Sequence, residues 1–278
     1  MTDNVNIPVE DLVAAAQELA LAARWERAAA LLGAAPDHPR LALAAAAVAV
    51  EADWHADTST AAERIAAVDP DRLDPNDRWD LEFLGLRDEY RRRLRTPDEG
   101  VRRRAGRLRA TAPDEGRRGW AEMYLGLIAD NLFDDHGAAP AHYASALQRS
   151  AAPGIGTASS GVETLGASAG DDLLRREALR HLGGHDHDNG EHRRALERWQ
   201  EATAAGARAG NVPGTLSQQM LLAVLARDEG DEAGATALAR EVARWAEAIG
   251  ANRIAAQATG FLGGVDPTKA PEPAAPAG

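Results

Sequence analysis

One pattern of residues occurs twice between Leu182 and Val242, and the two copies lie forty residues apart. In each copy a leucine and a small residue precede a turn of glycine and an acid, and a run of small or bulky apolar residues follows. The matched positions are Leu182/Leu222, Gly183/Ala223, Gly190/Gly230, Glu191/Asp231, Ala195/Ala235, Trp199/Ala239 and Ala202/Val242. Because one helical hairpin cannot bury its apolar stripe alone, this period predicts stacked copies of one helical unit.

Composition agrees with helices as the main structural element. Alanine, the strongest helix former, accounts for 62 of the 278 residues, whereas aromatic residues make up 4% of the chain. We therefore expect an all-α fold, an α-solenoid of antiparallel helical hairpins. Such an array grows in one dimension, so a chain of this length does not require one large core.

The charged residues and the lack of cysteine exclude several kinds of chemistry. There are 30 arginines but one lysine, Lys269, a skew that is typical of a GC-rich genome. Without another lysine, neither a P-loop nor a lysine Schiff base is expected. The absence of cysteine excludes thiol nucleophiles, thiolate zinc sites and disulfides. The net charge of −12 argues against general affinity for nucleic acids, and we predict no cofactor.

The amino-terminal residues predict a cytoplasmic protein. Met1 to Glu10 contains two acidic residues and no basic one, so the positive region that opens a secretory signal is missing. The most apolar run, Leu41 to Val50, spans ten residues, whereas a membrane helix requires roughly 18. We therefore expect no contact with a membrane.

Apolar residues at a 3.6-residue period, interrupted by proline and glycine, predict helices along most of the chain. The predicted helices are Glu10–Ala23, Trp25–Ala34, Arg40–Asp53, Ser59–Val68, Asp77–Arg95, Glu99–Ala112, Gly116–Phe133, Ala138–Ser150, Asp171–Asp188, Glu191–Ala209, Thr215–Asp228, Glu232–Ile249 and Arg253–Phe261. Residues 151–170, rich in glycine, alanine and serine, predict a loop or hinge. It separates divergent pairs in residues 1–150 from clearer repeats and a capping helix in residues 171–263. The Pro/Ala-rich tail, residues 264–278, is expected to be disordered.

The repeated residues resemble the tetratricopeptide repeat (TPR) family of helical hairpins. The family's spacing is matched by Leu182, Gly183, Gly190, Glu191, His192, Ala195, Trp199 and Ala202, and less closely upstream by Leu125, Gly126, Ala139, Tyr143 and Ala146. The period of forty exceeds the family's usual length of about 34 residues and is similar to a long-helix variety in bacterial regulatory proteins. The resemblance implies a right-handed superhelix in which small residues such as Gly183 let paired helices approach closely.

In such a superhelix the first helix of each pair lines a concave groove. The resemblance therefore implies a non-catalytic scaffold or adaptor that holds a protein or peptide partner. A regulatory role through that partner is compatible with this reading. The groove positions it implies are Trp120, Met123, Leu127, Asp130, Glu177, Arg180, Gly184, His187, Ser217, Met220, Val224 and Arg227. Arginine grips carboxylates bidentately and methionine adapts to apolar side chains, so an extended peptide with an acidic group suits this groove. Uncovered end units would also favour self-association.

A group of histidines supports an alternative function. His181 and His185 stand one helical turn apart, a spacing that two zinc ligands use, and His187 lies nearby. A zinc-binding protein or a metal-dependent hydrolase is therefore the alternative reading. Against it, Leu182 stands where the zinc-protease pattern places a glutamate.

Nucleic-acid binding through residues 87–118 is a further alternative. The stretch from Arg87 to Arg118 contains 12 arginines against six acidic residues, and arginines neutralise phosphates. Tyr90 is its one aromatic residue for base stacking. Six acids between Asp69 and Glu82 are candidate partners for these arginines within the chain.

Overall fold

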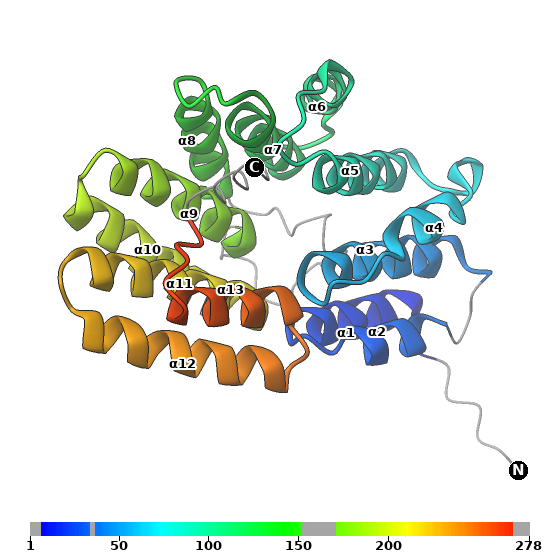
Figure 1. Ribbon diagram of the computed structural model, residues 1–278. Helices are drawn as coiled ribbons and strands as arrows, with labels where there is room; N and C mark the ends of the chain where they lie inside the picture. The colour runs from blue at the N-terminus through cyan, green and yellow to red at the C-terminus, as the bar shows by residue number, and fades with distance from the viewer. Residues whose placement is uncertain (1–6, 34–36, 152–170, 269–278) are drawn as a thin grey trace, which may run out of the picture.

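The computed structural model describes residues 7–33, 37–151 and 171–268. This part of the chain contains thirteen α-helices, one 3-10 helix (Pro70–Arg72) and no strand, so the all-α prediction is confirmed (Figure 1). The α-helices are α1 (Val9–Leu21), α2 (Trp25–Leu32), α3 (Pro39–His55), α4 (Ala61–Ala66), α5 (Pro75–Arg92), α6 (Glu99–Thr111), α7 (Glu115–Phe133), α8 (Ala139–Ser150), α9 (Asp172–Asp188), α10 (His192–Arg208), α11 (Val212–Asp228), α12 (Glu232–Ala248) and α13 (Asn252–Leu262).

The helix boundaries lie close to the predicted ones, and the largest difference at a helix start is at α11. The sequence pattern places that start at Thr215, but the helix begins at Val212. Pro213 is tolerated in the first turn because the first backbone N–H groups of a helix have no partner within it. The side chain of Asn211 caps this turn by accepting a hydrogen bond from the Gly214 N–H at 2.9 Å.

Helices α9 to α12 explain the sequence repeat. Each is 17 residues long, and each is followed by a three-residue turn. The middle residue of each turn is a glycine with φ between +67° and +87°, at Gly190, Gly210, Gly230 and Gly250. A glycine adopts this left-handed conformation without the strain that a side chain would cause, so it ends each helix at the same point. The structural period is therefore twenty residues, and the forty-residue sequence period is one helical pair.

Two close helix crossings depend on glycine, as the sequence predicts. A Cβ atom on Gly183 in α9 would lie 2.5 Å from Cδ1 of Trp199 in α10. In the preceding pair, a Cβ atom on Gly126 in α7 would lie 2.5 Å from Cε1 of Tyr143 in α8. Both aromatic rings are fully buried. In each pair a large ring therefore packs directly against the backbone of its partner helix.

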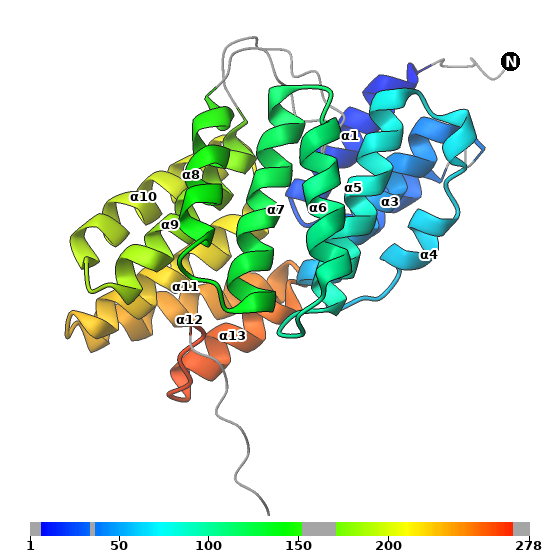
Figure 2. The same cartoon turned by 90° about the horizontal axis from the view of Figure 1, so that it is seen from above.

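The helices follow one another around a closed ring rather than along an open array. Neighbouring helices in the sequence pack together, and Figure 2 shows α5 to α8 side by side on one side of the molecule. The last helix, α13, then packs against α3 near the beginning of the chain (Figure 1). The Asn252 side chain donates a hydrogen bond to the Ala56 carbonyl oxygen across this junction at 3.2 Å.

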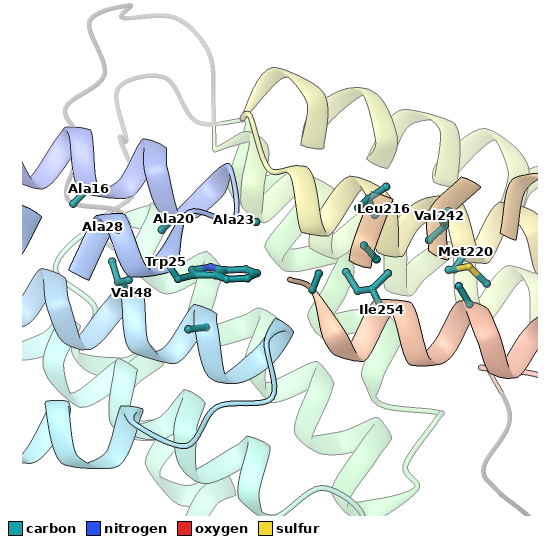
Figure 3. Packing of buried hydrophobic residues seen from close by; sticks show 14 of the residues in the cluster. Ala16, Ala20, Ala23, Trp25, Ala28, Val48, Leu216, Met220, Val242 and Ile254 are labelled. Atoms are coloured by element: carbon teal, nitrogen blue, oxygen red, sulfur yellow. The ribbon is translucent and has the colours of Figure 1, made fainter. Parts of the chain in front are cut away.

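One hydrophobic core closes the ring. It joins buried residues of α1 to α3 with buried residues of α11 to α13, among them Trp25, Met220 and Ile254. Figure 3 shows the Trp25 indole extending from the amino-terminal helices toward the carboxy-terminal ones. The two ends of the helical array therefore cover each other, whereas the prediction of self-association assumed uncovered ends.

Some predictions about organisation fall outside the described residues. These are the proposed loop or hinge, apart from Ala151, and most of the proposed tail, from Lys269 onward. The division at residues 151–170 also stays a prediction. The shared core nevertheless connects the first and last helices directly.

Candidate functional site

The ring of helices lines a partly open cavity of about 430 Å³. Its lining comes from α1, α3, α5, α7, α9, α11 and α13 or the turns beside them, so every lining helix is the first of a pair or the final helix. Known ligand cavities in proteins span about 300–1,000 Å³, so this volume suits a small molecule or a short segment of peptide. This is the main candidate site in the described part of the chain.

One wall of the cavity is aromatic. Trp54, Tyr90, Trp120 and Tyr124 come from three different helices; the two tryptophans are partly exposed, and the two tyrosines are buried beside them. The rings of Tyr90 and Tyr124 meet edge to face with their centroids 5.5 Å apart, and Trp54 lies 6.1 Å from Tyr90. Burial raises the pKa of both tyrosines, so their hydroxyl groups stay protonated. This wall offers apolar surface to a ligand.

Two ion pairs occupy the charged side of the cavity. Nη2 of Arg87 lies 2.6 Å from Oε1 of Glu51, and its Nε donates to the Tyr124 hydroxyl oxygen at 3.1 Å. Burial alone would raise the pKa of Glu51, but Arg87 holds it below its ordinary value. Arg176 pairs with Glu177 and also donates to the Gly214 carbonyl oxygen at 3.1 Å. Both glutamates are therefore already bound to arginines of the protein.

Three further arginines of the lining have no such partner. Among the described residues, no carboxylate lies within ion-pair distance of Arg95, Arg180 or Arg253. The Arg253 guanidinium lies 5.7 Å from the centre of a Trp54 ring, a cation–π contact. Nη1 of Arg180 lies 3.2 Å from Nε2 of His181. The Nε atom of Arg180 is buried and has no hydrogen-bond partner. Burial, reinforced by the neighbouring Arg176, lowers the pKa of Arg180.

The two histidines of the lining are neutral near pH 7. Burial, reinforced by Arg176, lowers the pKa of His55 to about 4. Burial and the adjacent Arg180 lower the pKa of His181 to about 3. Five arginines and two glutamates therefore set the formal charge of the lining, which is +3. The cavity is positive inside a chain whose net charge is −12.

Half of the predicted groove residues line this cavity, and half lie elsewhere. The six that line it are Trp120, Met123, Leu127, Glu177, Arg180 and Ser217. The six outside it are Asp130, Gly184, His187, Met220, Val224 and Arg227. The lining stretches of α9 and α11 end at His181 and Ser217, and the following turns of both helices contribute buried residues to the hydrophobic cores. The cavity itself therefore does not extend along the whole of these helices, as the prediction assumed for the groove.

The charged residues among the outlying six make contacts between helices instead. Asp130 accepts hydrogen bonds from the Tyr143 hydroxyl at 2.7 Å and from His185 at 3.0 Å. Arg227 stacks over the Phe261 ring, with Cζ 3.5 Å from its centre, and donates to the Phe261 carbonyl oxygen at 3.1 Å. Met220 is buried in the core that closes the ring. These contacts stabilise the packing of neighbouring helices.

The three histidines of the metal alternative are not brought together. His181 stacks on the Tyr143 ring at 5.0 Å, His185 binds Asp130, and Nε2 of His187 lies 2.7 Å from Oδ2 of Asp228 in α11. In the described ranges of the chain, no three histidine, aspartate or glutamate side chains gather in a way that could hold a metal ion.

The arginine-rich stretch is largely neutralised within the molecule. Nine of its twelve arginines form ion pairs, namely Arg87, Arg91, Arg92, Arg93, Arg102, Arg104, Arg109, Arg117 and Arg118. The predicted acidic partner segment contributes Asp80, which binds Arg117 through two hydrogen bonds of 2.8 Å. Most arginines of this stretch therefore already have a carboxylate partner within the chain, and nucleic-acid binding stays an untested alternative.

Comparison of the chain with protein-family models, with curated proteins and with solved structures found no match. Among the helices that the structure describes, none combines the length and the apolar composition needed to cross a bilayer.

Proposed function

We propose that this protein is a non-catalytic scaffold of TPR-like helical pairs that binds a short segment of a partner protein in its central cavity. One observation carries the proposal: the cavity is lined by the first helix of every pair, from α1 to α11, and by the final helix α13. This is the arrangement that the TPR resemblance implies for a binding surface. We keep the predicted cytoplasmic location as part of this proposal.

The size and the walls of the cavity favour a short segment over a folded domain. A volume of about 430 Å³ accommodates a few side chains, and the ring surrounds it with helices. The partly exposed rings of Trp54 and Trp120 provide apolar surface for such side chains, and aromatic residues commonly supply much of the energy of binding.

The protonation states of the lining support binding rather than proton transfer. A general base works best when its pKa lies near the working pH. The pKa values of His55 and His181 are about 4 and about 3, so neither imidazole is suited to take up a proton near pH 7. The glutamates are held by Arg87 and Arg176, which also makes them weak bases.

A selection from random peptides tests the proposal. A displayed library of twelve-residue peptides is selected on the full chain, and the enriched peptides are titrated against two variants. Ser217→Trp places a large ring in the cavity, whereas Ala237→Trp places the same ring on the exposed face of α12. We expect the enriched peptides to lose at least tenfold in affinity for Ser217→Trp and to bind Ala237→Trp as they bind the wild type.

Two results would contradict the proposal. One is that no peptide is enriched over a selection on the bare support. The other is that the enriched peptides bind Ser217→Trp and the wild type equally well, which would place their site outside the cavity. Circular dichroism of both variants controls for correct folding.

A further inference from the structure

We infer that Arg180 anchors an oxyanion of the bound segment, a carboxylate or a phosphate group, inside the cavity. This inference rests on the proposed function, because it specifies the chemistry of the occupant of the same site. It assigns a ligand-binding role to Arg180 and excludes one for Arg227, the other arginine of the predicted groove.

The cavity carries an excess of positive charge. Its two glutamates form ion pairs with Arg87 and Arg176, and Glu177 also attracts Arg180 at longer range, yet five arginines against two glutamates leave a formal excess of +3. An excess of positive charge inside a low-dielectric interior is unfavourable unless an anion compensates for it. Because the chain as a whole is acidic, this excess is a local property of the cavity.

Arg180 has a position suited to contact a ligand in the cavity. It lies in the middle of α9, and its half-buried side chain belongs to the cavity lining. Glu177, the nearest acid on the same helix face, is engaged by Arg176. Nε of Arg180 is buried and lacks a hydrogen-bond partner, although a guanidinium carries five N–H donors. Carboxylate and phosphate groups match this fork of donors with two parallel hydrogen bonds.

Arg180 differs from Arg227 and from the neighbouring His181. Arg227 is bound by Glu232 and stacked on Phe261, so its guanidinium is satisfied within the protein. Nε2 of His181 lies 3.2 Å from Arg180 Nη1 and orients the guanidinium without neutralising it, since this imidazole carries no negative charge. Trp120 on the nearby helix α7, which is partly exposed, gives the apolar part of the same ligand a place to pack.

Small probes test this inference separately from the peptide proposal. Phenylacetate and phenyl phosphate carry an oxyanion on an aromatic ring, and phenylacetamide is the neutral counterpart of phenylacetate. Each is titrated calorimetrically against the full chain, against Arg180→Gln, and against Arg193→Gln as a matched control. Arg193 is an arginine of α10 whose side chain is 90% exposed.

We expect at least one anionic probe to bind the wild type tenfold or more tightly than phenylacetamide. Arg180→Gln should remove this preference, and Arg193→Gln should keep it. The tighter of the two anionic probes identifies the group as a carboxylate or as a phosphate. Without any probe, Arg180→Gln should melt at or above the wild-type temperature, because it removes a buried cation that lacks a carboxylate partner.

Three results would overturn the inference: equal affinity for charged and neutral probes, an anion preference that survives in Arg180→Gln, or a clear loss of thermal stability in Arg180→Gln without ligand. The last result would make Arg180 a structural residue. The outcomes are distinguishable from failure of the proposed function. Enriched peptides that depend on the cavity but contain no acidic or phosphorylated residue would leave the scaffold proposal standing and refute the anion site.

Discussion

Two adjacent glycines in α9 should respond in opposite directions to the same substitution. Gly183 faces the Trp199 ring, and a Cβ atom there would lie 2.5 Å from both Cδ1 and Nε1 of that ring. Trp199 has no room to retreat, because it is 1% exposed and its Nε1 donates to the Arg180 carbonyl oxygen at 2.9 Å. At Gly184 a Cβ atom would meet nothing within 4 Å.

The expected magnitudes follow from these surroundings. Overpacking costs about 1–3 kcal/mol, and replacing a helical glycine by alanine gains about 0.5–1 kcal/mol. Gly183→Ala should therefore lower the free energy of unfolding by up to about 2.5 kcal/mol, whereas Gly184→Ala should raise it by about 0.5–1 kcal/mol. For a chain of this size, 1 kcal/mol corresponds to a shift of about 2–4 °C in Tm.

Urea and thermal unfolding followed by far-ultraviolet circular dichroism measure both effects. Equal effects of the two substitutions, or a Gly183→Ala variant more stable than the wild type, would refute the close crossing of α9 and α10. The preceding helical pair offers an independent repetition. Gly126→Ala in α7 should be destabilising because its Cβ atom would meet the Tyr143 ring. Gly106→Ala in α6, where a Cβ atom would meet nothing within 4 Å, is the control and should not be destabilising.

Three further predictions concern the core, its pH dependence and the closure of the ring. Trp199→Ala should cost about 3–5 kcal/mol in the free energy of unfolding, and a wild-type urea midpoint would contradict its packing role. Burial raises the pKa of Asp171 to about 7 against 3.8 in the unfolded chain, so the stability linked to its proton is complete below about pH 4 and is lost as the pH rises through about 7. Asp171→Asn retains the helix cap and should remove this loss of stability at higher pH, which urea titrations at several pH values measure. A pH profile of stability that is unchanged in the variant would argue against the raised pKa of Asp171. Ile254→Ala should reduce hydrogen-exchange protection in α1 to α3 as well as in α11 to α13. Leu108→Ala, in a different core cluster, should not have this effect. An effect of Ile254→Ala confined to α11 to α13 would contradict the shared core.

The helices and their crossings could be predicted because their causes are local. Proline and glycine mark the helix ends, and the apolar period marks the buried faces. The pairing of Gly183 with Trp199 was accessible for the same reason, since both residues lie within one repeat. The twenty-residue structural period was also present in the sequence, in the equal spacing of Gly190, Gly210, Gly230 and Gly250.

The closed ring and the limits of the cavity could not be predicted in this way. The contact between Ala56 and Asn252 joins residues 196 positions apart, and no local pattern encodes it. The closure decides which turns of α9 and α11 face the cavity, so Arg180 faces it and Arg227 does not. Likewise, the sequence alone could not distinguish the paired Arg87 from the unpaired Arg180, because their surroundings come from distant helices.

The cavity also contains residues that the sequence analysis did not select, notably Glu51, Trp54, Tyr124, Arg176 and Arg253. Glu51 had a recognisable signal, since it directly follows the most apolar stretch of the chain and precedes His55 by one helical turn. A charged pair on an otherwise apolar helix commonly indicates a buried polar site. The other four carry no signal of their own.

The most direct test of the binding site uses the distribution of the six tryptophans. Trp54 and Trp120 line the cavity, whereas Trp245 lies on α12 outside it and is 50% exposed. The protein is labelled with 5-fluorotryptophan, its fluorine resonances are assigned by single Trp→Phe substitutions, and the tightest selected peptide is titrated in. Binding in the cavity predicts shifts for Trp54 and Trp120 with Trp245 unchanged. Saturable binding that leaves Trp54 and Trp120 unshifted, or shifts Trp245 alone, would show that the partner binds elsewhere.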